Sequence, residues 1–230
     1  MRLTAKITLI FCLFWLFLVV SFYYTYNKVV KPEIYQFEIQ LAKEKLERFI
    51  RALNNEINTL HRFCLDYAWW DDTYEYVENK NEKYIRNNFT KETFIENQLN
   101  LVIIINNEGK IIYGEWFDSQ EGEKKELPRE LSSPIWALTH PLLKIANPRE
   151  GKTGFWKTNY GTLIVSSNKI LSSRNEGEPR GTLIFGRLIT PEFWKTISEH
   201  TILDISVVEY IDKDKILKKD VKEGEFPVFL

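Results

Sequence analysis

The chain has 230 residues and a formal net charge of -1, so it lacks the basic excess that a nucleic-acid partner would normally require. Hydrophobic residues make up 44% of the sequence and aromatic residues 14%, which is enough to bury a core. The two cysteines, Cys12 and Cys64, indicate neither a disulfide framework nor a metal cluster.

The N-terminus begins with an uncharged, apolar run from Ile7 to Asn27. About 20 apolar residues span the hydrocarbon core of a bilayer as a helix, and three tyrosines near the end of the run fall where an interfacial aromatic belt belongs. A cleaved signal peptide is the rival interpretation, but no A-x-A-like cleavage site follows the run. We therefore expect an uncleaved membrane anchor over residues 1–28, and the lysines on both sides leave its orientation open.

A helical pattern follows from about Lys31 to Val77. Its apolar residues step alternately by four and three positions, which is the spacing of a packed helix seam. The members of this stripe are Leu46, Ile50, Leu53, Ile57, Leu60, Cys64 and Tyr67. We expect residues 29–78 to form one long helix that pairs with a second copy through its membrane-proximal half. The same phase puts Asp71 and Tyr74 on the inward stripe, where an unpaired carboxylate would be costly to bury.

Beyond Leu99 the sequence changes to short apolar runs separated by turn residues, a pattern typical of strands. Leu101–Ile105 and Lys110–Trp116 flank an Asn-Asn-Glu-Gly turn and predict a hairpin. Three more strands are expected further along the chain, at Gly154–Lys157, Leu163–Ser166 and Thr182–Phe185.

Helices are expected at two places around these strands. A Ser-Pro pair at 133–134 predicts the N-cap and first position of a short helix. A Thr-Pro pair at 190–191 predicts a second helix that runs to about His200. The alternating run Ile202–Tyr210 is then expected to close the sheet.

The densest aromatic and acidic cluster ends the predicted long helix, with the sequence Asp66-Tyr67-Ala68-Trp69-Trp70-Asp71-Asp72-Thr73-Tyr74-Glu75-Tyr76-Val77. Together with matches downstream, it resembles the fourth family of CHASE domains (cyclase/histidine-kinase-associated sensory extracellular domains). The downstream matches are Asn81, Tyr84-Ile85, Asn87-Asn88, Leu99-Asn100, Gly161–Leu171 and Gly177–Arg187. The resemblance spans roughly Lys45 to Val208. It departs from the family pattern at Tyr67, where Trp is usual, and at Ser167-Asn168-Lys169, where an Arg-Pro pair is common.

The order of elements and the resemblance together predict an α+β fold. A long N-terminal helix, membrane anchor plus stalk, is followed by a PAS-like or Cache-like antiparallel sheet with flanking helices. We place the PAS-like sensory domain at residues 79–211 and a charged C-terminal tail at 212–230. The resemblance also implies that the domain after the anchor is extracytoplasmic, on a single-pass protein of the cell membrane.

A sensory role in signal transduction is what the resemblance implies for function. The domain would bind a small-molecule ligand of unknown identity, without a cofactor, and signal to a separate kinase or cyclase output protein. Receptors of this family usually carry a second membrane helix before the output domain. This chain ends before such a helix, so the output is expected in another protein unless the sequence is a piece of a longer one.

A ligand pocket is expected between the sheet and its flanking helices, the usual position in PAS-like sensors. The ligand-binding candidates are Trp69, Trp70, Asp71, Asp72, Tyr74 and Arg187. Asp71 is predicted to face inward and either to pair with Arg187 or to meet a cationic or hydrogen-bonding ligand. The competing interpretation is a buried Asp71–Arg187 ion pair that only fixes the helix on the sheet.

Enzymatic signatures are missing from the sequence: there is no G-x-S-x-G, H-E-x-x-H, C-x-x-C, phosphate loop or dinucleotide fingerprint. Asp71 and Asp72 are adjacent, and adjacent helical side chains diverge, so they are poor candidates for an acid/base pair. We expect no enzyme and no metal site. A structural or interaction module without a ligand of its own remains the alternative to a sensor.

Overall fold

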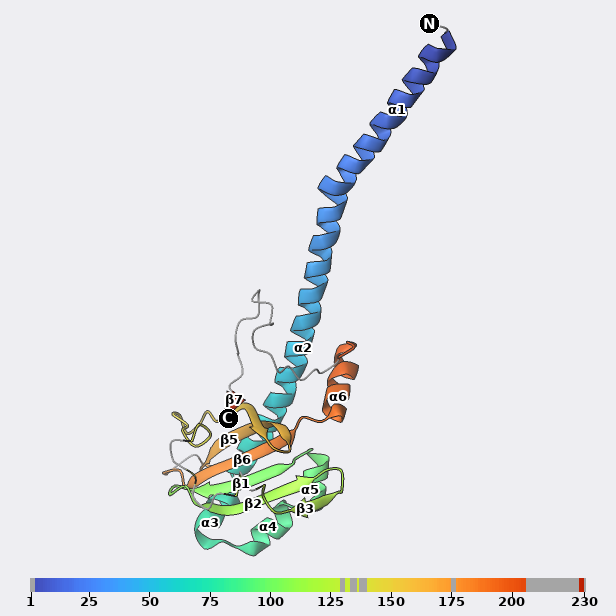
Figure 1. The fold of residues 1–230 in the computed structure, drawn as a ribbon. Helices are drawn as coiled ribbons and strands as arrows, with labels where there is room; N and C mark the ends of the chain where they lie inside the picture. Colours follow the sequence, from blue (N-terminus) through green and yellow to red (C-terminus); the bar gives the residue numbers. More distant parts are fainter. Residues whose placement is uncertain are drawn as a thin grey trace. The chain divides into compact units, whose positions relative to one another are not determined.

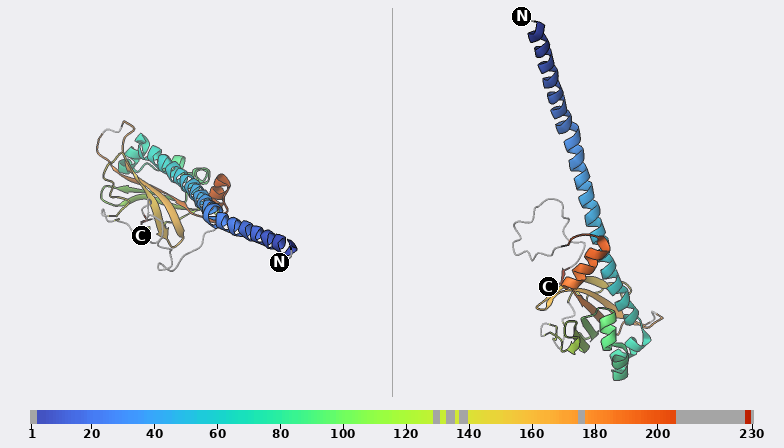
Figure 2. Two further views of the ribbon diagram at one scale, coloured as in Figure 1. Left: turned by 90° about the horizontal axis from the view of Figure 1, so that it is seen from above. Right: turned by 90° about the vertical axis from the view of Figure 1, so that its right-hand side faces the viewer.

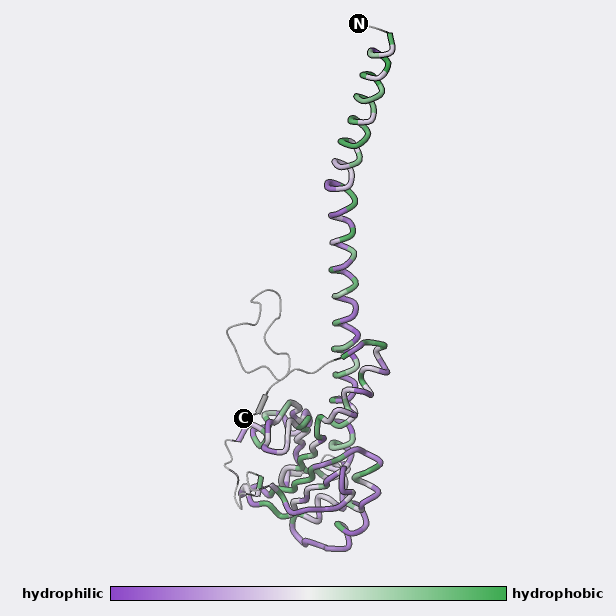
Figure 3. Tube along the Cα trace, turned by 45° about the vertical axis from the view of Figure 1, so that its right-hand side comes forward, coloured by the Kyte–Doolittle hydropathy of each residue, from purple (hydrophilic) through white to green (hydrophobic). Residues whose placement is uncertain are grey.

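The computed structural model describes residues 3–128, 131–132, 136, 140–174, 177–205 and 228–229. The chain divides into two compact units, residues 1–51 and 52–230. The first unit is helical throughout its described part: α1 (Leu3–Thr25) is followed by a π-helical stretch (Tyr26–Val30) and by the start of α2 (Figure 1). The apolar side chains of α1 are exposed, and Figure 3 shows the hydrophobic colour gathered along this helix. By length and composition, this helix could cross a membrane.

Helix α2 (Lys31–Ala68) carries the predicted apolar stripe. The stripe is exposed in the first part of the helix and buried in the second part. Leu46 is 56% exposed, whereas Leu53 is 7% exposed and Leu60 is 1% exposed. The stripe of the second unit packs inside that unit: Cys64 Sγ donates to the carbonyls of Ser166 and Leu183. The seam beyond Leu53 is therefore a contact of the helix with its own sheet.

The prediction of one helix as far as Val77 is wrong. Trp70 has an extended backbone, with φ of -100° and ψ of 135°, and a new helix, α3 (Asp71–Asn79), begins after it. The Ala68 carbonyl accepts a bond from the Leu171 amide instead of continuing the helix. The phase that put Asp71 on the inward stripe is therefore lost at Trp70.

The sheet has the strand order β3-β2-β1-β6-β5-β4-β7, and all pairs from β3 to β4 are antiparallel. The strands are β1 (Leu101–Asn106), β2 (Ile111–Asp118), β3 (Glu123–Lys125), β4 (Lys152–Thr158), β5 (Gly161–Ile170), β6 (Gly181–Leu188) and β7 (Val228–Phe229). Five of the six strands predicted from the sequence are present, and the sixth, Ile202–Tyr210, is not a strand in its described part, residues 202–205. The α+β, PAS-like fold with a long N-terminal helix is confirmed.

The remaining helices flank the sheet and are short: α4 (Glu82–Asn88), α5 (Lys91–Glu96) and α6 (Pro191–Thr201) (Figure 2). Thr190 caps α6 by accepting from the Phe193 amide, as its sequence predicts. Ile202 ends α6 in a left-handed conformation, with φ of 56°, rather than opening a strand. The expected helix at 133–134 and the end of the expected last strand, 206–210, lie outside the described residues.

Alternation along the strands gives the sheet two buried faces. One face holds a continuous apolar cluster that includes Ile103, Trp156 and Ile184. The other face packs on α2, where the Phe185 ring contacts those of Phe63 and Tyr67. Strands β5 and β6 are buried on both faces, and the middle of β5 carries three buried polar residues, Ser166, Ser167 and Asn168.

Candidate functional site

The first end of the β5–β6 pair is bound to α3 by Asp71. Its carboxylate accepts from the Ser173 amide at 2.9 Å and from the Ser173 hydroxyl at 2.6 Å. These two hydrogen bonds hold the pKa of Asp71 below its usual range. Asp71 is exposed, so the prediction that it faces inward is wrong.

Tyr74 continues this attachment one turn further along α3. The Arg180 guanidinium lies 3.8 Å from the centre of its ring and also donates to its backbone carbonyl. The Tyr74 hydroxyl donates to the carbonyl of Glu178, and Glu78 pairs with Arg180 at 3.1 Å. We call this set, Asp71, Tyr74 and Glu78 with Ser173 and Arg180, the α3 clamp.

The other predicted residues of the motif, Trp69, Trp70 and Asp72, stand beside the clamp, and none of them lines the pocket of about 620 Å³ described below. Trp70 is 40% exposed and its ring contacts Tyr67. Trp69 has a buried indole nitrogen with no hydrogen-bond partner among the described residues. Asp72 is exposed in the first turn of α3. This end therefore attaches a loop to a helix.

Arg187 lies toward the other end of the same strands. It is opposite Ile164 in the register, near the start of β5, whereas Ser173 lies beyond the end of β5. Its guanidinium pairs with Glu56 of α2, with 2.8 Å between Nη1 and Oε2, and it donates to the Asn97 carbonyl. Arg187 therefore pairs with Glu56 and not with Asp71, because nearly the whole length of the sheet separates the two predicted partners.

Among the ion pairs of the described residues, the Arg187–Glu56 pair has the most buried cation. The side chain of Arg187 is 9% exposed and that of Glu56 is 22% exposed. Burial lowers the pKa of Arg187, and the Glu56 carboxylate opposes that effect. Two guanidinium N–H groups are bonded as described, while the buried Nε has no partner among the described residues.

Asn100 locks the strand ends beside this pair. Its side-chain amide donates to the Phe117 carbonyl and to the Ser119 hydroxyl, and its oxygen accepts from the Leu188 amide at 2.8 Å. Asn100 is 4% exposed, so these bonds satisfy a polar group that would otherwise be costly to bury. The ends of β1, β2 and β6 are fixed together.

A pocket of about 620 Å³ opens at this end, between the strand ends, α2, α5 and α6. Its volume lies in the range of small-molecule sites, roughly 300–1,000 Å³. The polar wall includes Glu56, Asn100 and Arg187, and three phenylalanines supply apolar wall, Phe94, Phe117 and Phe193. We call it the α6 pocket.

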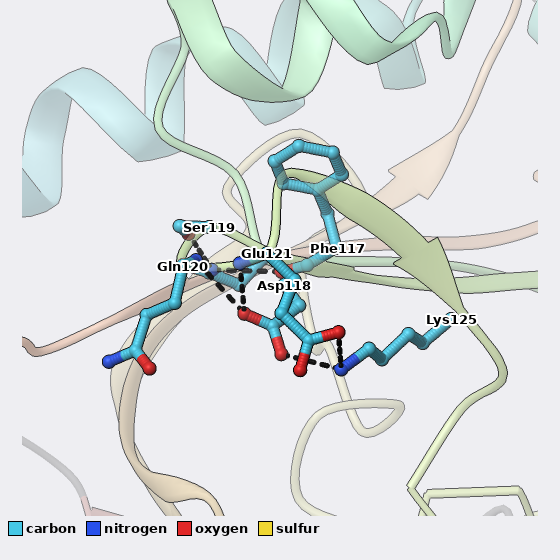
Figure 4. A network of polar contacts seen from close by, with 7 residues as sticks. Phe117, Asp118, Ser119, Gln120, Glu121 and Lys125 are labelled. Atoms are coloured by element: carbon cyan, nitrogen blue, oxygen red, sulfur yellow. Dashed lines mark hydrogen bonds and ion pairs between the residues drawn. The ribbon is translucent and has the colours of Figure 1, made fainter.

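The turn after β2 supplies one rim of the α6 pocket, and a network around Asp118 shapes it (Figure 4). Asp118 accepts from the amides of Gln120 and Glu121, and it pairs with Lys125 at 2.8 Å. These bonds, with that from Lys125 first, lower the pKa of Asp118. Ser119 and Gln120 are thereby held at the pocket rim.

Arg187 is the one predicted site residue that lines the α6 pocket; Glu56, Asn100 and the three phenylalanines were not predicted as site residues. The sequence offered one signal for Glu56, a carboxylate beside the buried stripe position Ile57. Among the described residues, no group of His, Cys, Asp and Glu side chains could hold a metal ion.

These features define a PAS-like α+β domain with a cavity at one edge of its sheet. The sequence model of the CHASE4 domain matches residues 52–208, so the chain belongs to the CHASE4 family. A curated relative, the methanogenesis regulatory histidine kinase FilI of Methanothrix harundinacea (strain 6Ac), is 31% identical over 144 residues. That match covers 63% of this chain and 16% of the relative, so the chain spans about a sixth of the kinase.

Two solved structures resemble the fold more distantly. A domain of a sensory box/GGDEF family protein from Vibrio parahaemolyticus has a TM-score of 0.48 and 11% identity, covering 64% of this chain and 59% of that one. The sensor domain of the V. cholerae histidine kinase DctB has a TM-score of 0.49 and 12% identity, covering 73% and 60%. Both TM-scores are low, so the fold assignment rests on the observed strand order and the family match.

Proposed function

We propose that this chain is a membrane-anchored, extracytoplasmic sensory module that binds a small ligand and passes a conformational change to a signalling partner. Its CHASE4 membership makes it a sensory domain. The apolar helix that precedes the domain supplies a candidate anchor. Both observations agree with the signalling role printed for the histidine kinase relative.

The observation that carries the proposal is the position of Glu56. This residue lines the α6 pocket, and it belongs to α2, the helix that connects the sensor domain to the apolar segment. Ligand binding that changed the Glu56–Arg187 contact would act directly on that helix. A ligand shifts a conformational equilibrium only by its differential affinity for the two states, and this ion pair is where such a difference would arise.

A kinase is the output partner that the relative suggests, either in the same polypeptide or as a separate protein. The test is reconstitution of the full chain in vesicles with a candidate kinase, followed by a ligand screen read out by melting temperature and by autophosphorylation. A ligand that binds the native state raises the melting temperature by mass action. A saturable shift accompanied by changed kinase activity supports the proposal. A screen without any saturable shift favours the structural module.

Topology is tested separately, with protease added to intact cells. The proposal expects digestion of the domain after the anchor, and protection would contradict it. The ligand roles of Trp69, Trp70, Asp71, Asp72 and Tyr74 also stay a proposal, tested by substituting each residue in the same ligand titration.

A homodimer through the membrane-proximal half of α2 also belongs to this proposal. Leu46 and Ile39 lie seven residues apart on one face of that half and are 56% and 38% exposed, whereas Leu53 is buried within the sensor domain. Leu46→Asp should therefore give monomers without unfolding the domain. Leu53→Asp should unfold it, because it buries an unpaired charge. Sedimentation of the full chain in detergent distinguishes these outcomes, and a monomeric wild type would contradict the dimer.

A further inference from the structure

Glu56 holds Arg187 through one short contact only. The fork of a guanidinium can bind a carboxylate through two parallel N–H bonds, which is the stronger arrangement. Here Nη1 reaches one oxygen of Glu56, Nη2 is bonded to the Asn97 carbonyl, and Nε lacks a partner among the described residues. Glu56 therefore occupies only one of the N–H donors that the buried Arg187 guanidinium could offer to a carboxylate.

Glu56 can also leave at a lower cost than Arg187. Its side chain lies on the helix surface and keeps 22% of its area in water, against 9% for Arg187. Both partners line the same pocket. A carboxylate that enters the pocket can therefore replace Glu56 at the guanidinium while Glu56 turns toward solvent. The buried charge stays paired throughout the exchange, which avoids the large penalty of an unpaired buried charge.

The rest of the pocket wall selects the body of such a ligand. Phe94 and Phe117 are stacked with 5.3 Å between ring centres, and Phe193 faces the same cavity from α6. Asn100 uses both of its side-chain N–H groups in bonds to Phe117 and Ser119, so it has no free donor for a ligand carboxylate. A flat apolar group can therefore stack on the phenylalanine side of the pocket. The neutral polar lining, besides Asn100, comprises Gln98, Ser119, Gln120, Thr190 and Thr196.

Two ionisable residues of α6, Glu192 and His200, complete the charges that line the pocket. Both are exposed, so water and salt screen their effect on a ligand more than they screen Arg187. Arg187 is therefore the charge that dominates recognition.

We infer that the α6 pocket binds a small carboxylate with an apolar, aromatic-sized body, and that its carboxylate displaces Glu56 from Arg187. This inference rests on the proposed sensory function and names its ligand class. Displacement removes an ionic tie between α2 and the sheet, so ligand chemistry is converted into a change on the helix that leads to the membrane segment.

The experiment uses the full chain in detergent micelles and three probes of similar shape: benzoate, benzamide and benzylamine. Benzoate should raise the melting temperature of the wild type saturably, whereas the neutral and cationic probes should not. If benzamide or benzylamine binds and benzoate does not, the ligand class is wrong while the proposed sensory function survives.

Glu56→Gln gives the sharper test because it removes the internal competitor and leaves Arg187 without a counter-ion. Benzoate should bind this variant on the order of tenfold more tightly than the wild type, since no binding energy is used to displace Glu56. It should also restore part of the melting temperature that the substitution loses. A Glu56→Gln protein that folds and shows no benzoate response overturns the inference.

Two further variants locate the effect. Arg187→Lys keeps the charge but loses the fork, so the benzoate response should fall at least about tenfold. Glu78→Gln removes the carboxylate of the exposed Arg180 pair, outside the pocket, and should respond to benzoate like the wild type. An equal response of Glu78→Gln and Glu56→Gln would place benzoate elsewhere and contradict displacement.

Discussion

The two ends of the β5–β6 pair each carry an arginine–glutamate pair from helix to sheet, and they differ in burial. At the α3 clamp, Glu78 and Arg180 are 65% and 29% exposed. At the α6 pocket, Glu56 and Arg187 are 22% and 9% exposed. If the exposed clamp pair is broken, water can solvate both charges. If the buried pocket pair is broken, Arg187 is left without a counter-ion. The conspicuous W-D-D motif lies at the first end, and the cavity lies at the second.

The comparison shows that residue types in the sequence do not by themselves reveal which end of the strand pair carries the pocket. Asp71 has the acidic and aromatic neighbours expected of a ligand site. The Asp71 carboxylate, however, accepts hydrogen bonds from the Ser173 amide and hydroxyl. Glu56 is inconspicuous in sequence but contacts a buried cation and a cavity. The consequences of removing charge should therefore be larger at the pocket than at the clamp.

The largest expected effect is that of Glu56→Gln. It leaves Arg187 buried without a counter-ion, so the free energy of unfolding should fall by about 3 kcal/mol. The matched change, Glu78→Gln at the exposed pair, should cost less than about 1 kcal/mol. Urea unfolding of the full chain in detergent measures both. Equal losses would remove the distinction between the two ends.

A smaller loss is expected for Arg180→Gln at the clamp. The variant loses the contact over the Tyr74 ring and the bond to the Tyr74 carbonyl. Such a partly exposed cation–π contact contributes about 1 kcal/mol. Tyr74→Phe keeps the ring and removes only the hydroxyl bond to Glu178, so it should cost less in the same urea experiment. If Arg180→Gln lowered the free energy of unfolding as much as Glu56→Gln does, the distinction between an exposed clamp and a buried pair would be contradicted.

Acidification should destabilise the contact between α2 and the middle of β5. His61 Nδ1 lies 3.1 Å from the Ser166 hydroxyl, and burial lowers the pKa of His61. The unfolded chain then binds the proton more readily than the folded one, so stability falls as the pH drops below about 6.5. His61→Gln should lose part of this slope, and His140, whose pKa burial also lowers, accounts for another part. Melting temperatures at pH 7 and pH 5 test this; an unchanged slope in His61→Gln would contradict it.

The smallest effect is local to Asp71. Its pKa is lowered by the Ser173 bonds, so the ionised form is favoured in the folded state. Its contribution is present above the unfolded value of about 3.9 and is lost as the pH falls through the lower folded value. Amide exchange of Ser173 should lose protection there in the wild type and respond less to pH in Asp71→Asn. The Leu171 amide, bonded to the Ala68 carbonyl, is the reference. Equal responses of the two amides would contradict a specific role for Asp71.

Local signals were sufficient to predict most of the fold. The Thr190-Pro191 cap predicted the start of α6, and the apolar runs predicted β1, β5 and β6, because caps and alternation depend on neighbours within a few residues. The motif around Trp69 and Trp70 predicted the family, which the match over residues 52–208 confirms. The domain limits at 28, 78 and 211 stay predictions.

The site was only partly predictable. Arg187 was recognised as a candidate, but its partner Glu56 lies 131 residues away in the sequence, on the helix face that packs on β6. The chain has 32 Asp and Glu residues, and no local sequence pattern indicates which of their carboxylates pairs with a distant arginine. The register of β5 against β6 decides it, by separating Arg187 from Asp71 along the sheet.

The sequence by itself determined the apolar N-terminal run, the stripe of α2, the strands and the family, since each depends on periodicity or composition within a short segment. The break at Trp70 was decided by tertiary structure, where the Leu171 amide bonds to the Ala68 carbonyl and Ser173 bonds to Asp71. Tertiary packing also decided which carboxylate met Arg187 and where a cavity remained. Those outcomes depend on which distant groups burial leaves within bonding distance, and an unpaired buried charge is too costly to leave without a partner.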